Sequence, residues 1–529
     1  MTKISYKVLI TTSGFGQRLG EITKYTNKAL VRVGKKPVIS YIIESYPSNV
    51  ECVITLRHFG HQIKDFVKLA YPKRKFTFVE ESEIPKEGGC FSLGSSMLAA
   101  RKYLQCPFIF QCCDTIVTEP IPKPDHNWNG VYKSSDSAQY SSVTALDGYI
   151  QKINSKGALE FDFLHIGLVG INDFKNFWKI LEGLLKENPL DSSLNDCKVI
   201  NNMMKDGHSF RTHEFKSWYD TGNTEGLHRA RESIQDAFPN LEKLKESLFL
   251  FDNFAIKFFF EEDTVKNRVK RGKILNGLVP SIEGATKNFF RYKFIDGELY
   301  SRVVTPHDFT QFLSWSKKHL WKKKTNIDLK KFPAVCHDFY FTKSLNRIEK
   351  FFNLHDLKDH ETIINSERIP QIRELFAMID FDWLSQAEPY QFHGDFILDN
   401  ILKTSKGYCL LDWRQDFGGL LEAGDIYYDL AKLNHNLTVN HDIVSKNLFT
   451  IHMTDHSVFC DILRKENLVQ CQKVFYDFVQ NNNFSWKKIQ ILTALIWLNM
   501  SPLHHYPFNL FLFYFGKLNL WRALEKKDS

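Results

Sequence analysis

Residues 11–20 are TTSGFGQRLG, and they follow the apolar run YKVLI at residues 6–10. A glycine-rich turn after a strand lets backbone N–H groups approach a phosphate chain, and Gly14 and Gly16 provide such a turn here. Arg18 can clamp phosphate oxygens as a planar fork, and Lys28 adds a point charge. On the glycines alone, a tight strand-to-helix turn with surface cations is the better explanation.

Outward from this turn, strand-like and helix-like segments alternate as far as Pro239. ECVITLRH (51–58) and PFIFQCCD (107–114) have the apolar runs of buried strands, while HQIKDFVKLAY (61–71) has apolar residues at helical spacing. The alternation predicts an α/β fold for residues 1–238, with a Rossmann-like parallel sheet wrapped by helices.

The pattern changes after Pro239. Two strand pairs, 247–260 and 289–304, turn at Asp252-Asn253 and Asp296-Gly297 and flank a helical segment at 261–275. From residue 306 the pattern is mostly helical. We therefore predict a small α+β lobe at 239–305 and a large, mostly helical lobe at 306–529.

Bulk composition limits the functional classes. The 529 residues carry a net charge of +8, and the hydrophobic fraction of 43% is ordinary for a soluble globular protein. The short basic runs lack the interleaved aromatics of a nucleic-acid platform, so we expect no nucleic-acid partner. The ten cysteines form no CxxC pair, and no apolar run reaches the length of a membrane span. These features predict a cytoplasmic enzyme without membrane insertion.

Longer strings in the first part carry a family resemblance. GFGQRL with NKALVRVGKKPVI (27–39) resembles the opening signature of nucleotidylyltransferases that activate sugar phosphates and phosphocholine. GGCFSLGSSMLAA (88–100), with Gly89, is similar to that family's loop near the nucleobase, and SWYDTGNTEGL (217–227) is similar to its closing motif. The resemblance covers roughly the first 235 residues. One departure is Asn27, where the family usually has proline before the lysine.

This resemblance implies a reaction and a metal. A phosphate monoester attacks the α-phosphorus of a nucleoside triphosphate, CTP or UTP by preference, and pyrophosphate leaves. Both reactants are anions, so Mg²⁺ is expected between them, held by Asp114 and Asp220. Buried aspartates at strand ends would be costly without a cation.

A second set of candidate residues lies in FHGDFILDNIL (392–402). Asp395 follows a His-Gly pair and Asn400 comes five residues later, the spacing of a kinase catalytic loop. GYCLLDW (407–413) then supplies Asp412 after a short strand. Asp395 would orient or deprotonate a hydroxyl, and Asn400 and Asp412 would hold Mg²⁺. The set resembles the aminoglycoside phosphotransferase and choline kinase superfamily, a protein-kinase-like fold, over roughly residues 240–525.

The proposed small lobe departs from that family in two ways. NFAIKFF (253–259) offers Lys257 for the phosphates of ATP, but no glycine-rich loop precedes it. The following helix also lacks a central glutamate to pair with Lys257, which leaves Glu261, Glu262 and Glu283 as alternatives.

Together the motifs predict a bifunctional, Mg²⁺-dependent enzyme. A kinase part phosphorylates a small molecule with ATP, and the nucleotidylyltransferase part then makes an NDP- or CDP-linked donor for surface polysaccharide or capsule synthesis. The acceptor is a sugar or an amino alcohol such as choline or ethanolamine, and the loop at 87–96 is nearer to the sugar-phosphate branch. A regulatory pseudokinase and an aminoglycoside-resistance enzyme are the alternatives.

Overall fold

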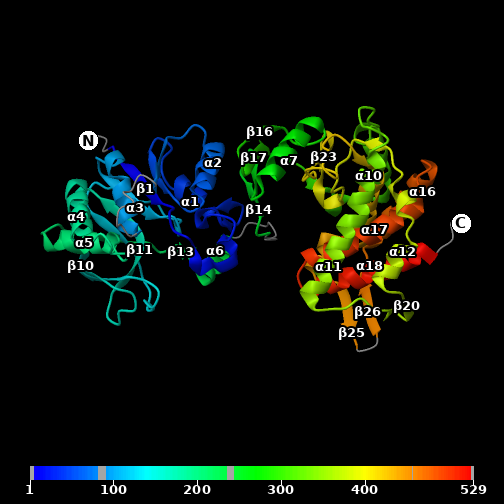
Figure 1. Ribbon diagram of the computed structural model, residues 1–529. Helices are drawn as coiled ribbons and strands as arrows, with labels where there is room; N and C mark the ends of the chain where they lie inside the picture. Colours follow the sequence, from blue (N-terminus) through cyan, green and yellow to red (C-terminus); the bar gives the residue numbers. More distant parts are fainter. Residues whose placement is uncertain (1–4, 82–90, 235–242, 455–456, 526–529) are drawn as a thin grey trace. The chain divides into compact units, whose positions relative to one another are not determined.

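Figure 1 shows the computed structural model, which describes residues 5–81, 91–234, 243–454 and 457–525. The chain forms two compact units. The first comprises Met1–Val265 with Glu283–Phe294, and the second comprises Lys266–Ile282 with Ile295–Ser529. Most strands of the expected small lobe belong to the first unit, whereas most of its helix and the short strand Glu298–Leu299 belong to the second. The division at residues 238 and 305 stays a prediction.

The first unit is built on a nine-stranded mixed sheet in the order β5-β4-β1-β6-β11-β8-β12-β10-β9. Four neighbouring strands pair in parallel. The apolar residues of the three inner strands are buried because parallel strands are covered on both faces, whereas Phe76 and Phe78 of the edge strand are partly buried. The four strands are β1 (Lys7–Thr11), β4 (Cys52–Leu56), β5 (Phe76–Glu80) and β6 (Phe108–Cys112).

Beyond β6 the sheet is largely antiparallel, which corrects the prediction of a parallel sheet. β11 (Phe163–Ile171) pairs antiparallel with both β6 and β8 (Trp128–Tyr132). Parallel neighbours need a long crossover, usually a helix, and residues 113–162 contain none. The remaining strands of this sheet are β9 (Ser142–Leu146), β10 (Tyr149–Asn154) and β12 (Arg211–Glu214).

Amphipathic helices of the first unit bury their apolar residues in two hydrophobic clusters. They are α1 (Val38–Glu44), α2 (Gly60–Ala70), α3 (Leu93–Ala99), α4 (Phe174–Glu187), α5 (Asp196–Lys205) and α6 (Thr224–Ser233). A second sheet, β14-β15-β17-β16, packs its aromatic residues on α2, where the ring of Phe66 lies 5.3 Å from that of Phe249. Its strands are β14 (Glu246–Leu250), β15 (Phe254–Phe259), β16 (Ile282–Ala285) and β17 (Phe289–Lys293).

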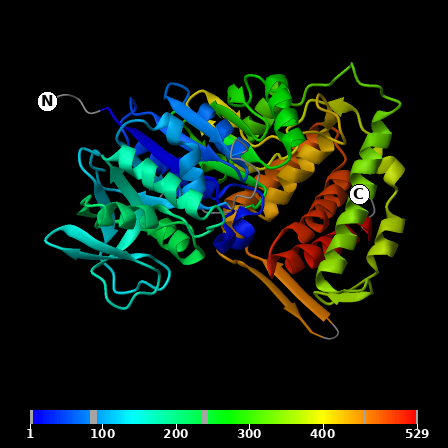
Figure 2. The same ribbon diagram turned by 60° about the vertical axis from the view of Figure 1, so that its left-hand side comes forward.

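The second unit is mostly helical. α17 (Trp486–Met500) is buried along most of its length between α14 (Ile426–Thr438) and α18 (Phe508–Glu525). The strand pair β25 (Phe449–Met453) and β26 (Ser457–Ile462) extends away from these helices (Figure 2). Other helices are α7 (Glu262–Ile274), α9 (Pro306–His319), α10 (Phe332–His337), α11 (Lys343–His355) and α16 (Glu466–Asn481).

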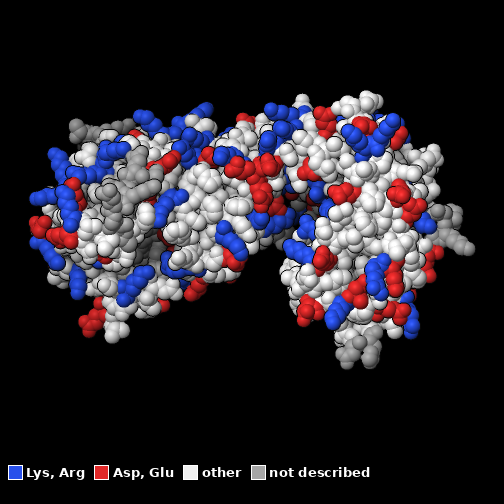
Figure 3. Space-filling view, in the orientation of Figure 1, with Lys and Arg blue, Asp and Glu red and all other residues white. Residues whose placement is uncertain are grey.

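On the face drawn in Figure 3, lysine and arginine side chains are spread over both units, in line with a net charge of +8 distributed through the sequence. Within the described part of the chain, no helix combines the length and the apolar character needed to cross a membrane.

Candidate functional sites

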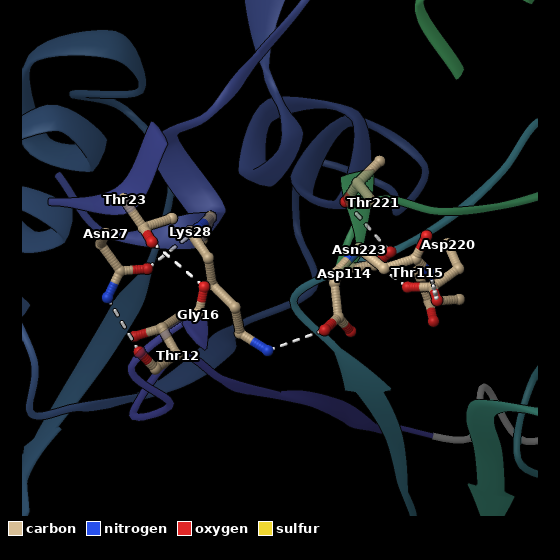
Figure 4. Close-up of polar contacts among 12 residues, drawn as sticks. Thr12, Gly16, Thr23, Asn27, Lys28, Asp114, Thr115, Asp220, Thr221 and Asn223 are labelled. Carbon is tan, nitrogen blue, oxygen red and sulfur yellow. Dashed lines mark hydrogen bonds and ion pairs between the residues drawn. The ribbon is translucent and has the colours of Figure 1, made fainter. Parts of the chain in front are cut away.

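The glycine turn after β1 is shaped by Gly16. Its φ of 70° lies in the left-handed region that favours glycine. A side chain at Gly16 would also meet Thr23 Cγ2 at 3.0 Å and Lys28 Cβ at 3.2 Å. The hydroxyl of Thr23 donates to the Gly16 carbonyl at 3.1 Å and closes the turn (Figure 4). Gly16 is therefore required both for its backbone conformation and for its lack of a side chain.

Asn27, the departure from the family pattern, anchors Lys28. Its Nδ2 donates to the carbonyls of Thr12 at 2.9 Å and His58 at 2.6 Å. Its Oδ1 accepts from the backbone N of Ala29 at 2.9 Å and caps the short helix that begins at Lys28. A proline at this position would have no amide to make these bonds, so Asn27 positions Lys28 in a different way.

Lys28 and Asp114 form a shielded ion pair. Lys28 Nζ lies 2.7 Å from Asp114 Oδ2, and the two side chains are 19% and 15% exposed. Burial favours the neutral lysine, but the charge of Asp114 outweighs it and raises the pKa of Lys28. Burial also opposes the charged carboxylate, yet Lys28 holds the pKa of Asp114 below its usual value. Both groups therefore stay charged at neutral pH.

Asp220 is brought beside Asp114 by a short strand pair. β13 (Trp218–Asp220) runs antiparallel to β7 (Thr115–Val117), with Asp220 opposite Thr115. The backbone N of Thr221 also donates to the Asp114 carbonyl at 2.8 Å. Figure 4 shows the two aspartates on neighbouring segments.

Three donors orient the Asp220 carboxylate. They are the backbone N of Gly222 at 2.8 Å, Asn223 Nδ2 at 2.6 Å and the Tyr140 hydroxyl at 3.1 Å. Asn223 also caps α6, because its Oδ1 accepts from the backbone N of Gly226 at 2.8 Å. The start of α6 and the direction of the carboxylate thus depend on one side chain.

The predicted residues converge on Gly222. A Cβ at that position would lie 2.6 Å from Asp114 Oδ2, 3.0 Å from Arg18 Nη2 and 3.0 Å from Asp220 Oδ1. Burial and then the charge of Asp114 raise the pKa of Asp220, which shows that the two carboxylates repel each other. Closely placed carboxylate oxygens are the ligands that Mg²⁺ prefers, so this cradle fits the metal predicted from the sequence.

Replacement of Gly222 by alanine is expected to reduce nucleotidyl transfer by about 10² or more, because the new methyl group displaces both carboxylates and Arg18. Gly183→Ala on α4 is the matched control, since a Cβ there meets nothing within 4 Å. Steady-state pyrophosphate release measures both variants. Equal activity of the two alanine variants would contradict a site at Gly222.

In the second unit the predicted loop residues lie together. Asn400 Nδ2 donates to Asp395 Oδ2 at 3.0 Å and to the Asp395 carbonyl at 2.9 Å. Lys432 on α14 forms an ion pair with Asp395 Oδ1 at 2.7 Å. Burial opposes the charged Asp395, but Lys432 outweighs it and lowers the pKa of Asp395. The sequence analysis missed Lys432 because it lies outside the loop motif, on a helix that the motif alone does not place.

His393 joins the loop that contains Asp395 to the segment that contains Asp412. Asp412 has a φ of 55°, which is uncommon for a residue other than glycine. His393 Nδ1 accepts from the backbone N of Asp395 at 3.3 Å, so Nε2 carries the proton that is donated to the Leu411 carbonyl at 2.8 Å. Burial lowers the pKa of His393 to about 4, which keeps this neutral tautomer at physiological pH.

Two buried charged residues clamp the backbone of the loop. Asp429 accepts from the backbone N of His393 and of Gly394, each at 2.7 Å. Asp425 caps α14. Arg271 on α7, 1% exposed, was not predicted. Its guanidinium donates to the carbonyls of Phe392, His393, Arg414 and Leu421.

Replacement of Arg271 by methionine is expected to lower the free energy of local opening of this loop by about 3 kcal/mol or more, because several buried carbonyls lose their hydrogen-bond donors. Hydrogen–deuterium exchange over residues 392–395 measures the effect locally, so it does not depend on two-state unfolding. Arg302→Met, at an exposed arginine, is the control. Unchanged exchange in the Arg271 variant would contradict the clamp.

Lys257 and the three predicted loop residues belong to different compact units. Lys257 lies on β15 in the first unit, whereas Asp395, Asn400 and Asp412 lie in the second. Each glutamate considered as its partner has another ion pair: Glu261 with Lys245, Glu262 with Lys287, and Glu283 with Arg291. On α7, Arg268 pairs with Asp412. Gly89 lies outside the described residues.

Comparisons with known proteins were made for the whole chain. No family model and no curated protein matches it. Similar solved structures include a CTP:phosphocholine cytidylyltransferase from Streptococcus pneumoniae, at 17% identity over 44% of this chain and 100% of that chain, with a TM-score of 0.37. A putative glucose-1-phosphate thymidylyltransferase from Bacillus anthracis is 19% identical over 45% and 98%, with a TM-score of 0.36. The inositol-1-phosphate CTP transferase from T. maritima is 16% identical over 44% and 98%, with a TM-score of 0.34.

Proposed function

We propose that the first unit transfers a nucleotidyl group from a nucleoside triphosphate to a phosphate monoester. The observation that carries this proposal is the convergence of Asp114, Asp220 and Arg18 on Gly222. The glycine turn, with Gly14 and Gly16, and Lys28 border the same place, since Gly14 would meet Lys28 Cε at 3.5 Å if it had a side chain. Two acids and two cations around a phosphate-type turn suit a reaction between two anions.

The chain's own residues divide the work in this proposal. Arg18 and the glycine turn bind the triphosphate, and Lys28 is positioned by Asn27 to exchange Asp114 for a phosphate oxygen. Asp114 and Asp220 would hold Mg²⁺, which would supply positive charge to neutralise the two anionic reactants. Tyr140 and Asn223 keep Asp220 oriented while this exchange occurs.

For the second unit we propose a small-molecule phosphotransferase that uses ATP. Asp395 faces the acceptor hydroxyl, and Asn400 and Asp412 are the proposed Mg²⁺ ligands, because His393 ties their two loops together. Its product would be the phosphate monoester that the first unit consumes. The chain would then convert one alcohol, ATP and CTP or UTP into a nucleotide-activated donor of the kind used in surface polysaccharide synthesis.

A second candidate is a nucleotidylyltransferase with a regulatory second unit that does not transfer phosphate. The ion pairs of Arg268 with Asp412 and of Lys432 with Asp395 favour it, because cationic side chains stand where a metal and a substrate would bind. ATP-dependent consumption of any acceptor would exclude this candidate.

One screen tests both activities. The protein is incubated with ATP, Mg²⁺, one of CTP, UTP, GTP or dTTP, and pooled sugars and amino alcohols, and the products are analysed by mass spectrometry. A new NDP-linked mass identifies base and acceptor together. Absence of nucleotidyl transfer from every triphosphate to a pooled set of phosphate monoesters would contradict the proposal for the first unit.

A further inference from the structure

Two cations lie over one aromatic ring beside the proposed catalytic loop. Lys343 Nζ is 3.9 Å from the ring centroid of Phe339, and Arg414 Cζ is 5.2 Å from the same centroid. Arg414 is held at the loop, because its backbone N donates to the His393 carbonyl at 3.0 Å. Its Cβ lies 2.6 Å from where a Cβ of Gly394 would be. Phe339 thus connects Lys343 to the residues next to Asp395.

The helix that carries Lys343 has an irregular turn at this point. α10 continues into a π-helical turn, η5 (Asp338–Thr342), which is followed directly by α11. Single π turns are rare and occur frequently at functional sites. Phe339 lies in the turn and Lys343 follows it. Arg347 comes one helical turn later, on the same face as Lys343.

Positive charge is in excess here. Lys343 is partly buried and forms no ion pair or hydrogen bond within the described ranges of the chain. Burial, and then the charges of Arg414, Arg347 and Lys432, hold the pKa of Lys343 well below its usual value, and the charge of Asp416 acts in the opposite direction. Like charges placed this close together destabilise the fold unless an anion joins them.

A small hollow adjoins this cluster and contains a second unpaired group. Phe339, Lys343, Tyr428 and Asn499 are among its lining residues. Asn499 Nδ2 donates to Ser344 Oγ at 2.9 Å. Its Oδ1 is buried and has no hydrogen-bond partner among the described residues. The lining therefore includes the Lys343 amino group and one amide oxygen, which accepts hydrogen bonds and so suits a hydroxyl group rather than an anionic one.

We infer that the phosphate acceptor of the second unit is an anion, a small molecule that carries a carboxylate or phosphate group as well as its reactive hydroxyl. Lys343, Arg347 and Arg414 bind the charged group, and Asp395 receives the hydroxyl. The inference rests on the phosphotransferase activity proposed above. The hydroxyl oxygen bonds to the γ-phosphorus of ATP, the bond from that phosphorus to the ADP oxygen breaks, and the hydroxyl proton passes to Asp395.

This inference separates the acceptor classes that the sequence leaves open. Choline or ethanolamine would need aromatic faces and a carboxylate around a cation. Here Lys343 and Arg414 already lie over the Phe339 ring, and Lys432 pairs with Asp395. A cationic acceptor placed at this ring would be repelled by Lys343 and Arg414. Sugar acids, sugar phosphates and similar hydroxylated anions fit the cluster.

The kinetic test compares Lys343→Met with Lys350→Met, a control at an exposed lysine of the same helix. Glycerate, glycerol phosphate, glycerol and choline are the first matched acceptors, together with sugar acids and neutral sugars. We expect the unmodified protein to phosphorylate only the anionic acceptors. In Lys343→Met, the KM for the anionic acceptor should rise about tenfold or more, and the KM for ATP should stay unchanged. Preference for glycerol, a neutral sugar or choline would overturn the inference while the phosphotransferase proposal stands. A raised KM for ATP alone would assign the cations to the nucleotide and also overturn it.

A binding measurement separates failure of the inference from failure of the enzyme. Inorganic phosphate is titrated into the full chain without nucleotide, so the sites of the first unit are the same in every variant. We expect Lys343→Met to lose the phosphate binding at the Lys343 cluster, which Lys350→Met keeps. The Lys343 variant should fold at least as well as the control, because it removes one of several neighbouring positive charges. Equal phosphate binding by both variants would overturn the inference. If Lys343→Met loses phosphate binding and the unmodified chain phosphorylates no acceptor, the anion site is supported and the phosphotransferase proposal is refuted.

Discussion

Replacement of Asp114 by asparagine is expected to reduce nucleotidyl transfer by about 10³, while ATP-dependent phosphorylation by the second unit continues. The substitution removes one of the two carboxylates proposed to hold Mg²⁺ and the counter-charge of Lys28. The remaining carboxylate, Asp220, cannot neutralise two anionic reactants through a weakly held metal. Pyrophosphate release from a pre-phosphorylated acceptor is the measurement.

Asp206→Asn controls for this prediction, because Asp206 is an exposed residue at the end of α5. Lys28 loses its ion-pair partner in the Asp114 variant, which could lower the stability of the protein. The unfolding midpoint of the Asp114 variant is therefore compared with that of the Asp206 variant. Near-normal nucleotidyl transfer by a folded Asp114 variant would refute the assignment of the metal site. Simultaneous loss of phosphorylation would indicate that the two activities share residues.

Asp395→Asn is expected to reduce phosphorylation of the free acceptor by about 10²- to 10⁴-fold and to leave nucleotidyl transfer from a pre-phosphorylated acceptor unchanged. An amide cannot accept the hydroxyl proton and does not attract the acceptor's hydroxyl as a carboxylate does. ATP consumption and product mass, followed in the same reaction, measure the two activities separately.

The partner of Asp395 requires a second variant. Asp395→Asn leaves Lys432 partly buried without its ion pair, and Asp395→Asn combined with Lys432→Met removes both charges. Asp477→Asn, at an exposed residue of α16, is the neutral control. Phosphorylation that persists in both Asp395 variants would show that Asp395 is not the residue that faces the hydroxyl.

Local sequence determined much of the first unit. The apolar runs of β1, β4 and β6 and the glycine turn after β1 could be predicted because their signals lie within ten or so residues. The residue types of the candidate site also followed from its chemistry, since anionic reactants need acids for a metal and cations for phosphates. Strand direction beyond β6 could not be predicted, because an apolar run has the same pattern in parallel and antiparallel pairs.

Only the tertiary structure decided how the candidate residues act together. Asp114 and Thr221 are 107 residues apart, yet the pairing of β7 with β13 brings their segments into hydrogen-bond contact and places Gly222 between two carboxylates. Arg271 and Lys343 are unremarkable in the sequence, as basic residues of helical segments usually face solvent. Their roles arise from burial and from neighbouring charges contributed by distant segments. The sequence by itself determined which chemical groups are available. The fold decided which of those groups meet at short distance, and charge compensation depends on distance in space and not on distance along the chain.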